Sequence, residues 1–180
     1  MAELVPDSGD HASHAPKTGL AHWLHQITTW WALGGGFVFV AIVVMSIVSI
    51  VGRKLFSHPI EGDMELLMMG AAIGSAAFLP ICELEDHHIK VDALTTWMSQ
   101  RGRAWLDAVA HALIAIVAAV LTWRTALYVL ETHENMEVST LLLIPVWQPV
   151  VLMVPSFVLL TLAGLYRTQT SLGLALGGQK

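Results

Sequence analysis

The sequence contains long apolar runs that end abruptly at charged residues. The run from Leu66 to Cys82 has no charged residue, with Glu65 before it and Glu83 and Glu85 directly after it. A soluble amphipathic helix would instead carry charges along one face of its whole length. A change from charged to apolar and back is typical of a helix that crosses a bilayer. We therefore expect this stretch to be a transmembrane helix.

The composition excludes an ordinary soluble domain. Of the 180 residues, 55% are hydrophobic and 13% are charged, whereas a soluble domain has about 25% charged residues. Lipid cannot bond free backbone groups, so a spanning segment must be a helix or belong to a closed barrel. The apolar runs are continuous rather than alternating, which excludes barrel strands. We predict an all-α integral membrane protein, and the single cysteine, Cys82, excludes an intrachain disulfide.

Four transmembrane helices are expected, with both termini on one side. They are predicted at Trp31 to Val51, Leu66 to Cys82 with Glu65 at the interface, Ala104 to Leu130, and Trp147 to Tyr166. A short loop makes the first two spans an antiparallel hairpin. The last apolar run begins at Val138 and is interrupted by prolines. We interpret its first part, to about Pro145, as a non-spanning approach, and predict a kink near Pro155.

Small residues occur in the first two spans. Gly70 and Gly74 form a small-xxx-small pair that lets another helix approach closely. Small residues are also common in membrane helices without such a role. The three glycines at positions 34–36 have two readings as well, a close helix approach or a loose helix entry.

A short helix in the membrane interface is expected between the second and third spans. Val91, Leu94 and Met98 share one helical face, and the segment is too polar to span. Asp92 is a plausible N-cap for it. The domain organisation is then a polar N-terminal tail (1–19), a four-helix membrane domain (20–167) and a C-terminal tail (168–180).

Ionisable residues are rare inside the spans. Asp107 and His111 are one turn apart and can hydrogen-bond. Arg124 falls in the last two turns of the predicted third span, so its guanidinium can reach the surface by snorkelling. Intramembrane charges mark ion pathways, and their scarcity favours a supporting subunit. We expect no catalytic, cofactor-binding or metal-ligating residue, no enzymatic activity and no nucleic-acid partner.

The basic residues predict the orientation in the membrane. The side that holds both termini carries six of them, whereas the other side carries Arg53 and Lys54. Basic residues concentrate on the cytoplasmic side. We therefore expect both termini, and the interfacial helix, in the cytoplasm. The six are Lys17, Lys90, Arg101, Arg103, Arg167 and Lys180.

Four sequence pieces, in order, resemble the small membrane subunit of tripartite ATP-independent periplasmic (TRAP) transporters, the DctQ-like family. They are GRKLFSHPIEGDMELL after the first span, HHIKVDAL after the second, TWR near the end of the third, and STLLLIPVWQP before the fourth. The resemblance covers roughly Phe37 to Leu165. Arg53, Glu65, His88 and Asp92 match recurrent family positions and are candidates for structural or interface roles.

The resemblance implies a role in the bacterial inner membrane. Members of the family pair with a large multi-span permease that carries substrate and sodium, and a periplasmic binding protein captures the substrate, often an organic acid. The small subunit is then expected to brace the permease scaffold within the membrane lipid. Two alternatives remain open, a haem b-binding anchor of a respiratory enzyme and a free-standing membrane scaffold. A bis-His haem needs two facing histidines, whereas only His111 lies inside an apolar span.

Overall fold

The computed structural model describes residues 19–56, 60–85 and 100–176, which fold into four helices. These are α1 (Gly19–Phe56), α2 (Asp63–Leu84), α3 (Gln100–Glu134) and α4 (Trp147–Ala175). All four are long and apolar enough to cross a membrane, as predicted. The predicted N-terminal tail and interfacial helix lie outside the described residues. The segment after Glu134 is non-helical, with an isolated β-bridge between Val138 and Pro145, as expected for the approach to the fourth span.

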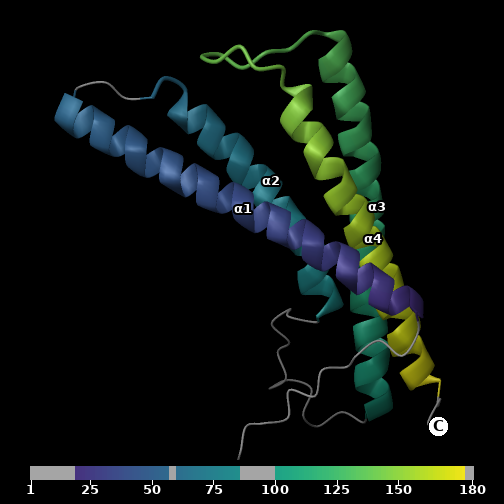
Figure 1. Cartoon of the computed structure of the whole chain (residues 1–180). Helices are drawn as coiled ribbons and strands as arrows, with labels where there is room; N and C mark the ends of the chain where they lie inside the picture. Colours follow the sequence, from purple (N-terminus) through teal and green to yellow (C-terminus); the bar gives the residue numbers. More distant parts are fainter. Residues whose placement is uncertain (1–18, 57–59, 86–99, 177–180) are drawn as a thin grey trace, which may run out of the picture.

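The helices form two antiparallel hairpins that diverge from one another (Figure 1). Within the hairpins α1 packs on α2 and α3 packs on α4, and the two hairpins meet chiefly where α2 contacts α4. Figure 1 shows α1 and α2 inclined to α3 and α4, with the hairpins farthest apart at the end where the α3–α4 loop lies. A V-shaped molecule exposes more helix surface than a closed four-helix bundle.

Close approach of α1 and α2 depends on glycine. A Cβ on Gly70 would collide with the side chain of Ile42, and one on Gly74 would lie 2.6 Å from the Phe39 ring. A Cβ on Gly35 would lie 2.6 Å from that of Ala77. The small-residue face of the second span is therefore used, and its partner is α1 of the same chain.

Alanine and glycine also line the contact between α3 and α4. Ala115 and Ala118 are buried on α3, and Ala163 is buried on α4. A Cβ added to Gly164 would lie 3.1 Å from the Cβ of Ala115. These small side chains let the two backbones approach closely along the hairpin.

All four helices extend beyond the predicted spans, and α2 does so by only two or three residues at each end. α1 begins at Gly19, α3 continues to Glu134, and α4 continues to Ala175. With 38 residues, α1 is about 57 Å long at ~1.5 Å per residue, well over the ~30 Å of a bilayer core. The extension of α3 corrects one interpretation: Arg124 lies well before the end of the helix rather than in its last two turns.

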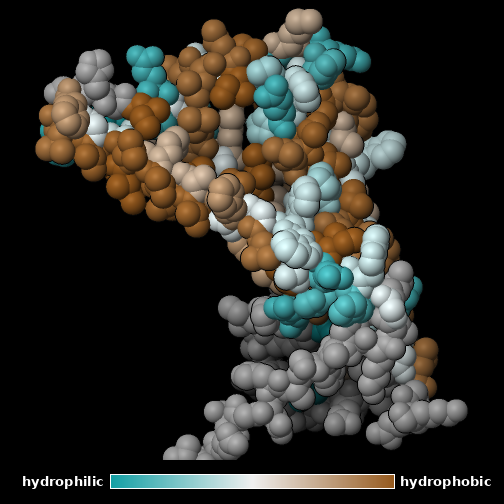
Figure 2. Space-filling model, in the orientation of Figure 1, coloured by the Kyte–Doolittle hydropathy of each residue, from teal (hydrophilic) through white to brown (hydrophobic). Residues whose placement is uncertain are grey.

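Many large apolar side chains are exposed on all four helices. Figure 2 shows them in brown along the α1–α2 arm, with hydrophilic residues gathered mainly toward the ends of the helices. Lipid or another membrane protein must cover such a surface. The exposed apolar residues of α1 include Trp30, Leu33, Phe37, Val40, Val44, Ile47, Val48 and Val51.

Candidate functional site

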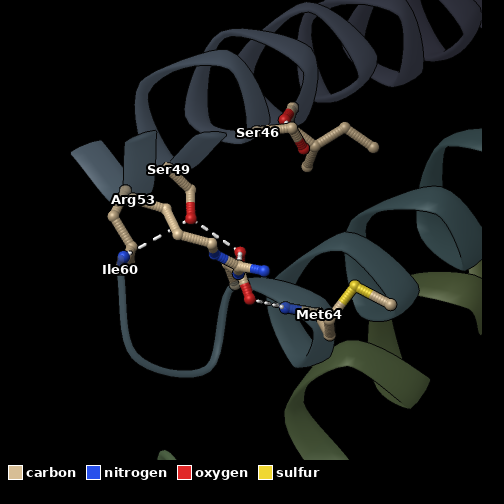
Figure 3. Close-up of polar contacts among 7 residues, drawn as sticks. Ser46, Ser49, Arg53, Ile60 and Met64 are labelled. Carbon is tan, nitrogen blue, oxygen red and sulfur yellow. Dashed lines mark hydrogen bonds and ion pairs between the residues drawn. The ribbon is translucent and has the colours of Figure 1, made fainter. Parts of the chain in front are cut away.

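A polar cluster holds the turn between α1 and α2 (Figure 3). The Ser49 hydroxyl donates to Oδ2 of Asp63 at 2.6 Å, and the same oxygen accepts from Nη2 of Arg53 at 3.2 Å. The other oxygen, Oδ1, accepts from the amide of Met64 at 2.8 Å, within the first turn of α2. Figure 3 shows Ser49 and Arg53 turned from α1 toward the start of α2. The site candidate Arg53 therefore ties together the two helices of one hairpin.

Glu65 ties the start of α2 to the α3–α4 loop. Its Oε1 accepts from the Thr140 hydroxyl at 2.7 Å and from the Leu141 amide at 2.9 Å. Its Oε2 accepts from the Leu142 amide at 3.1 Å. Beside it, Gly62 has φ +73° and lies directly against the Leu142 side chain, so this position favours glycine on two counts. Glu65 thus joins the two hairpins at their divergent end.

A second, buried contact joins the hairpins near the other end of α2. His111 Nδ1 on α3 lies 2.6 Å from Oε1 of Glu83. The side chains are 5% and 0% exposed. A charged group withdrawn from water is stable only when it is paired and hydrogen-bonded. The pair therefore fixes the position of α2 relative to α3.

The sequence does not identify this pair. Glu83 was interpreted as the charged exit of the second span, whereas the structure buries it as part of the helix. The partner considered for His111 was Asp107, one turn away on the same helix. One feature of the sequence could have indicated the pair. Glu83 and His111 are ionisable residues near the same depth on two consecutive spans. The other two site candidates, His88 and Asp92, lie outside the described residues.

Two weaker contacts connect α1 to the rest of the molecule. The Trp31 indole Nε1 donates to the Ser156 hydroxyl of α4 at 2.9 Å. His25 Nε2 lies 3.4 Å from Oε1 of Glu85, just after the end of α2. The first half of α1 therefore contacts α4 as well as the end of α2. Its second half contacts α2 and the α1–α2 turn.

One charged residue stands apart from these clusters. The Arg124 side chain is exposed on α3, between the exposed residues Leu121 and Leu127. Insertion of an arginine at the centre of a membrane helix costs about 2.5–3.5 kcal/mol. Within the part of the chain that the structure describes, its guanidinium makes no ion pair.

The polar contacts are suited to holding helices in place. In the described ranges, no group of three or more His, Cys, Asp or Glu residues is arranged to hold a metal ion. Apart from His111, the described histidines lie in the end turns of helices, with His22 and His25 in α1 and His133 in α3. The observed geometry therefore gives no support to the haem-anchor alternative.

Comparison with known proteins identifies the family. The chain matches no curated protein and no solved structure. Residues 42–172 match the family described as "Tripartite ATP-independent periplasmic transporters, DctQ component". That family is a transporter component and not an enzyme family. The match extends from the middle of α1 almost to the end of α4. The chain therefore belongs to the DctQ family and is the small membrane component of a TRAP transporter.

Proposed function

We propose that this chain braces the large permease of a sodium-coupled, binding-protein-dependent secondary transporter for organic acids in the bacterial inner membrane. Substrate and sodium bind to the permease, and a periplasmic protein delivers the substrate. The observation that carries the proposal is the divergence of the two hairpins. It leaves the length of α1 packed on α2 but otherwise largely uncovered.

The fixed geometry of the V supports a bracing role. Glu65 holds the hairpins at one end of α2, and the Glu83–His111 pair holds them near the other end. A coupled carrier usually binds its substrate and ions near the membrane midplane, where helices are broken. The four helices of the described residues are continuous. Bracing by packed helices, rather than ion binding, fits these continuous elements.

An apolar crevice between the hairpins is a second surface, besides α1, that suits packing against the permease. It has a volume of about 420 Å³ and lies where α1 and α2 diverge from α4. Its walls expose almost only carbon, so they suit lipid or an apolar helix of the partner. The lining includes Ile42, Met45, Leu66, Met69, Pro149 and Leu152.

Co-purification tests the proposal. We expect an affinity-tagged permease, encoded with this chain, to retain it through purification in mild detergent. Deletion of the chain should abolish transport because the complex fails to assemble. Stable recovery of a fully active permease without this chain would exclude a bracing role.

The proposed orientation places both termini in the cytoplasm. Arg103 and Arg167 lie toward the end of the molecule opposite Arg53 and Lys54, as the alternation of the helices requires. A reporter that is active only in the periplasm should give no signal when fused to Lys180. A strong signal would reverse the orientation.

The interfacial helix between α2 and α3 is part of the proposal. If His88 to Met98 lies on the membrane surface, Leu94→Glu places a charge on the lipid side. It should reduce the amount of assembled complex more than Thr96→Glu, its control on the polar face. Equal effects would remove the assignment of the two faces.

A further inference from the structure

Arg124 lies on an apolar face of α3 that none of the other three described helices covers. The residues one turn before and after it, Val120, Leu121, Leu127 and Tyr128, are between 41% and 56% exposed. Arg124 is itself an exposed residue, and it forms no hydrogen bond or ion pair with the described part of the chain. A cation among exposed apolar side chains calls for a partner from outside the described part of the chain.

Two contacts give reference levels along α3. The rings of His133 and Trp147 have their centroids 5.4 Å apart. The last turn of α3 and the first residue of α4 therefore lie at the same level. The Glu83–His111 pair marks the opposite level, near the end of α2. His111 and His133 are 22 residues, or ~33 Å, apart on α3.

Arg124 lies near the middle of that interval. It precedes His133 by about nine residues, or ~13 Å along the helix axis. The opposite level, at His111, is farther away still.

We propose that Arg124 is an anchor for the permease and pairs with a carboxylate on one of its transmembrane helices. The inference rests on the proposed function, since it names the contact through which the permease is held. A guanidinium binds a carboxylate through two parallel hydrogen bonds, which adds orientation to attraction. The surrounding apolar face of α3 would be covered by the same helix and would exclude water from the pair.

Substitution tests the charge requirement. In the complex purified through a tagged permease, Arg124→Gln should lower the recovery of this chain at least fivefold. Arg124→Lys should lower it less, because the charge stays but the paired hydrogen bonds are lost. Lys54→Gln is the control, since Lys54 is an exposed cation in the last turn of α1, and it should change recovery little. Equal recovery of Arg124→Gln and the wild type would overturn the inference.

Photo-crosslinking tests the contact with Arg124 in place. Benzoylphenylalanine at Leu121 or Leu127 should give an adduct with the permease in membranes. If these positions capture only lipid, and the effect of Arg124→Gln appears only in vesicles containing phosphatidylglycerol and not in phosphatidylcholine, the guanidinium binds lipid phosphate and the inference is wrong. Failure of the wild-type chain to co-purify with the permease would instead contradict the proposed function itself.

Discussion

The two ends of α2 join the hairpins by different means. Near its end, the Glu83 carboxylate is fully buried against His111. At its start, Glu65 binds two backbone amides and a hydroxyl of a partly exposed loop. Water can replace the partners of Glu65 but cannot reach Glu83. Glutamate therefore joins the hairpins in two different ways. We call the Glu83–His111 pair the buried lock, and the contacts of Glu65 with the α3–α4 loop the loop clamp.

The largest effect is expected at the buried lock. His111→Ala removes the His111 contact of Glu83 in a site closed to water. Loss of one member of a buried pair costs about 3–5 kcal/mol, so the free energy of unfolding in detergent should fall by about that amount. Chemical denaturation of the single and double variants measures it. If Glu83→Ala and His111→Ala were additive, the two side chains would not act as a pair.

The next effect is expected where α1 touches α2. Gly35→Ala places a Cβ 2.6 Å from that of Ala77 and 3.2 Å from the backbone oxygen of Gly74. Such overpacking costs about 1–3 kcal/mol. The matched control is Gly34→Ala, whose Cβ would meet no atom within 4 Å. It should be neutral or stabilising by up to ~1 kcal/mol, because alanine favours the helix. An equal loss of unfolding free energy in Gly35→Ala and Gly34→Ala, measured by denaturation, would contradict the close contact between α1 and α2.

A smaller and local effect is expected at the loop clamp. Glu65→Gln removes one acceptor oxygen and the charge, so the α3–α4 loop should open more often. Hydrogen exchange at the Leu141 and Leu142 amides should accelerate severalfold, while exchange around His111 stays unchanged. Arg53→Gln, which affects only the α1–α2 turn, is the control and should leave both amides unaffected. Faster exchange at both ends of α2 would show that the two contacts are not independent.

The sequence predicts some of these features and not others. The four spans and the non-helical segment before Trp147 follow from local patterns, namely uncharged runs and prolines. Helix ends are less predictable, because polar residues such as Arg167 continue α4 beyond its apolar run. In its most apolar stretch α1 has 11% of residues buried, against 28% for the other three helices, and hydropathy alone does not distinguish them.

The candidate site was predicted only in part. Arg53 and Glu65 were selected by resemblance, and the structure supplies their partners, Asp63 and the α3–α4 loop. The Glu83–His111 pair was missed because it joins residues from different helices. Its formation depends on the relative level of α2 and α3, which no local pattern encodes.

Sodium-dependent uptake in reconstituted vesicles, normalised to the amount of assembled complex, tests the central claim most directly. If this chain supports the permease without binding ions, Asp107→Asn, His111→Gln and Arg124→Gln should lower the amount of complex or the maximal rate. The apparent sodium affinity and stoichiometry should stay unchanged, because those sites belong to the permease. A shift in sodium affinity or stoichiometry with any of the three would show that this chain contributes to the coupling site.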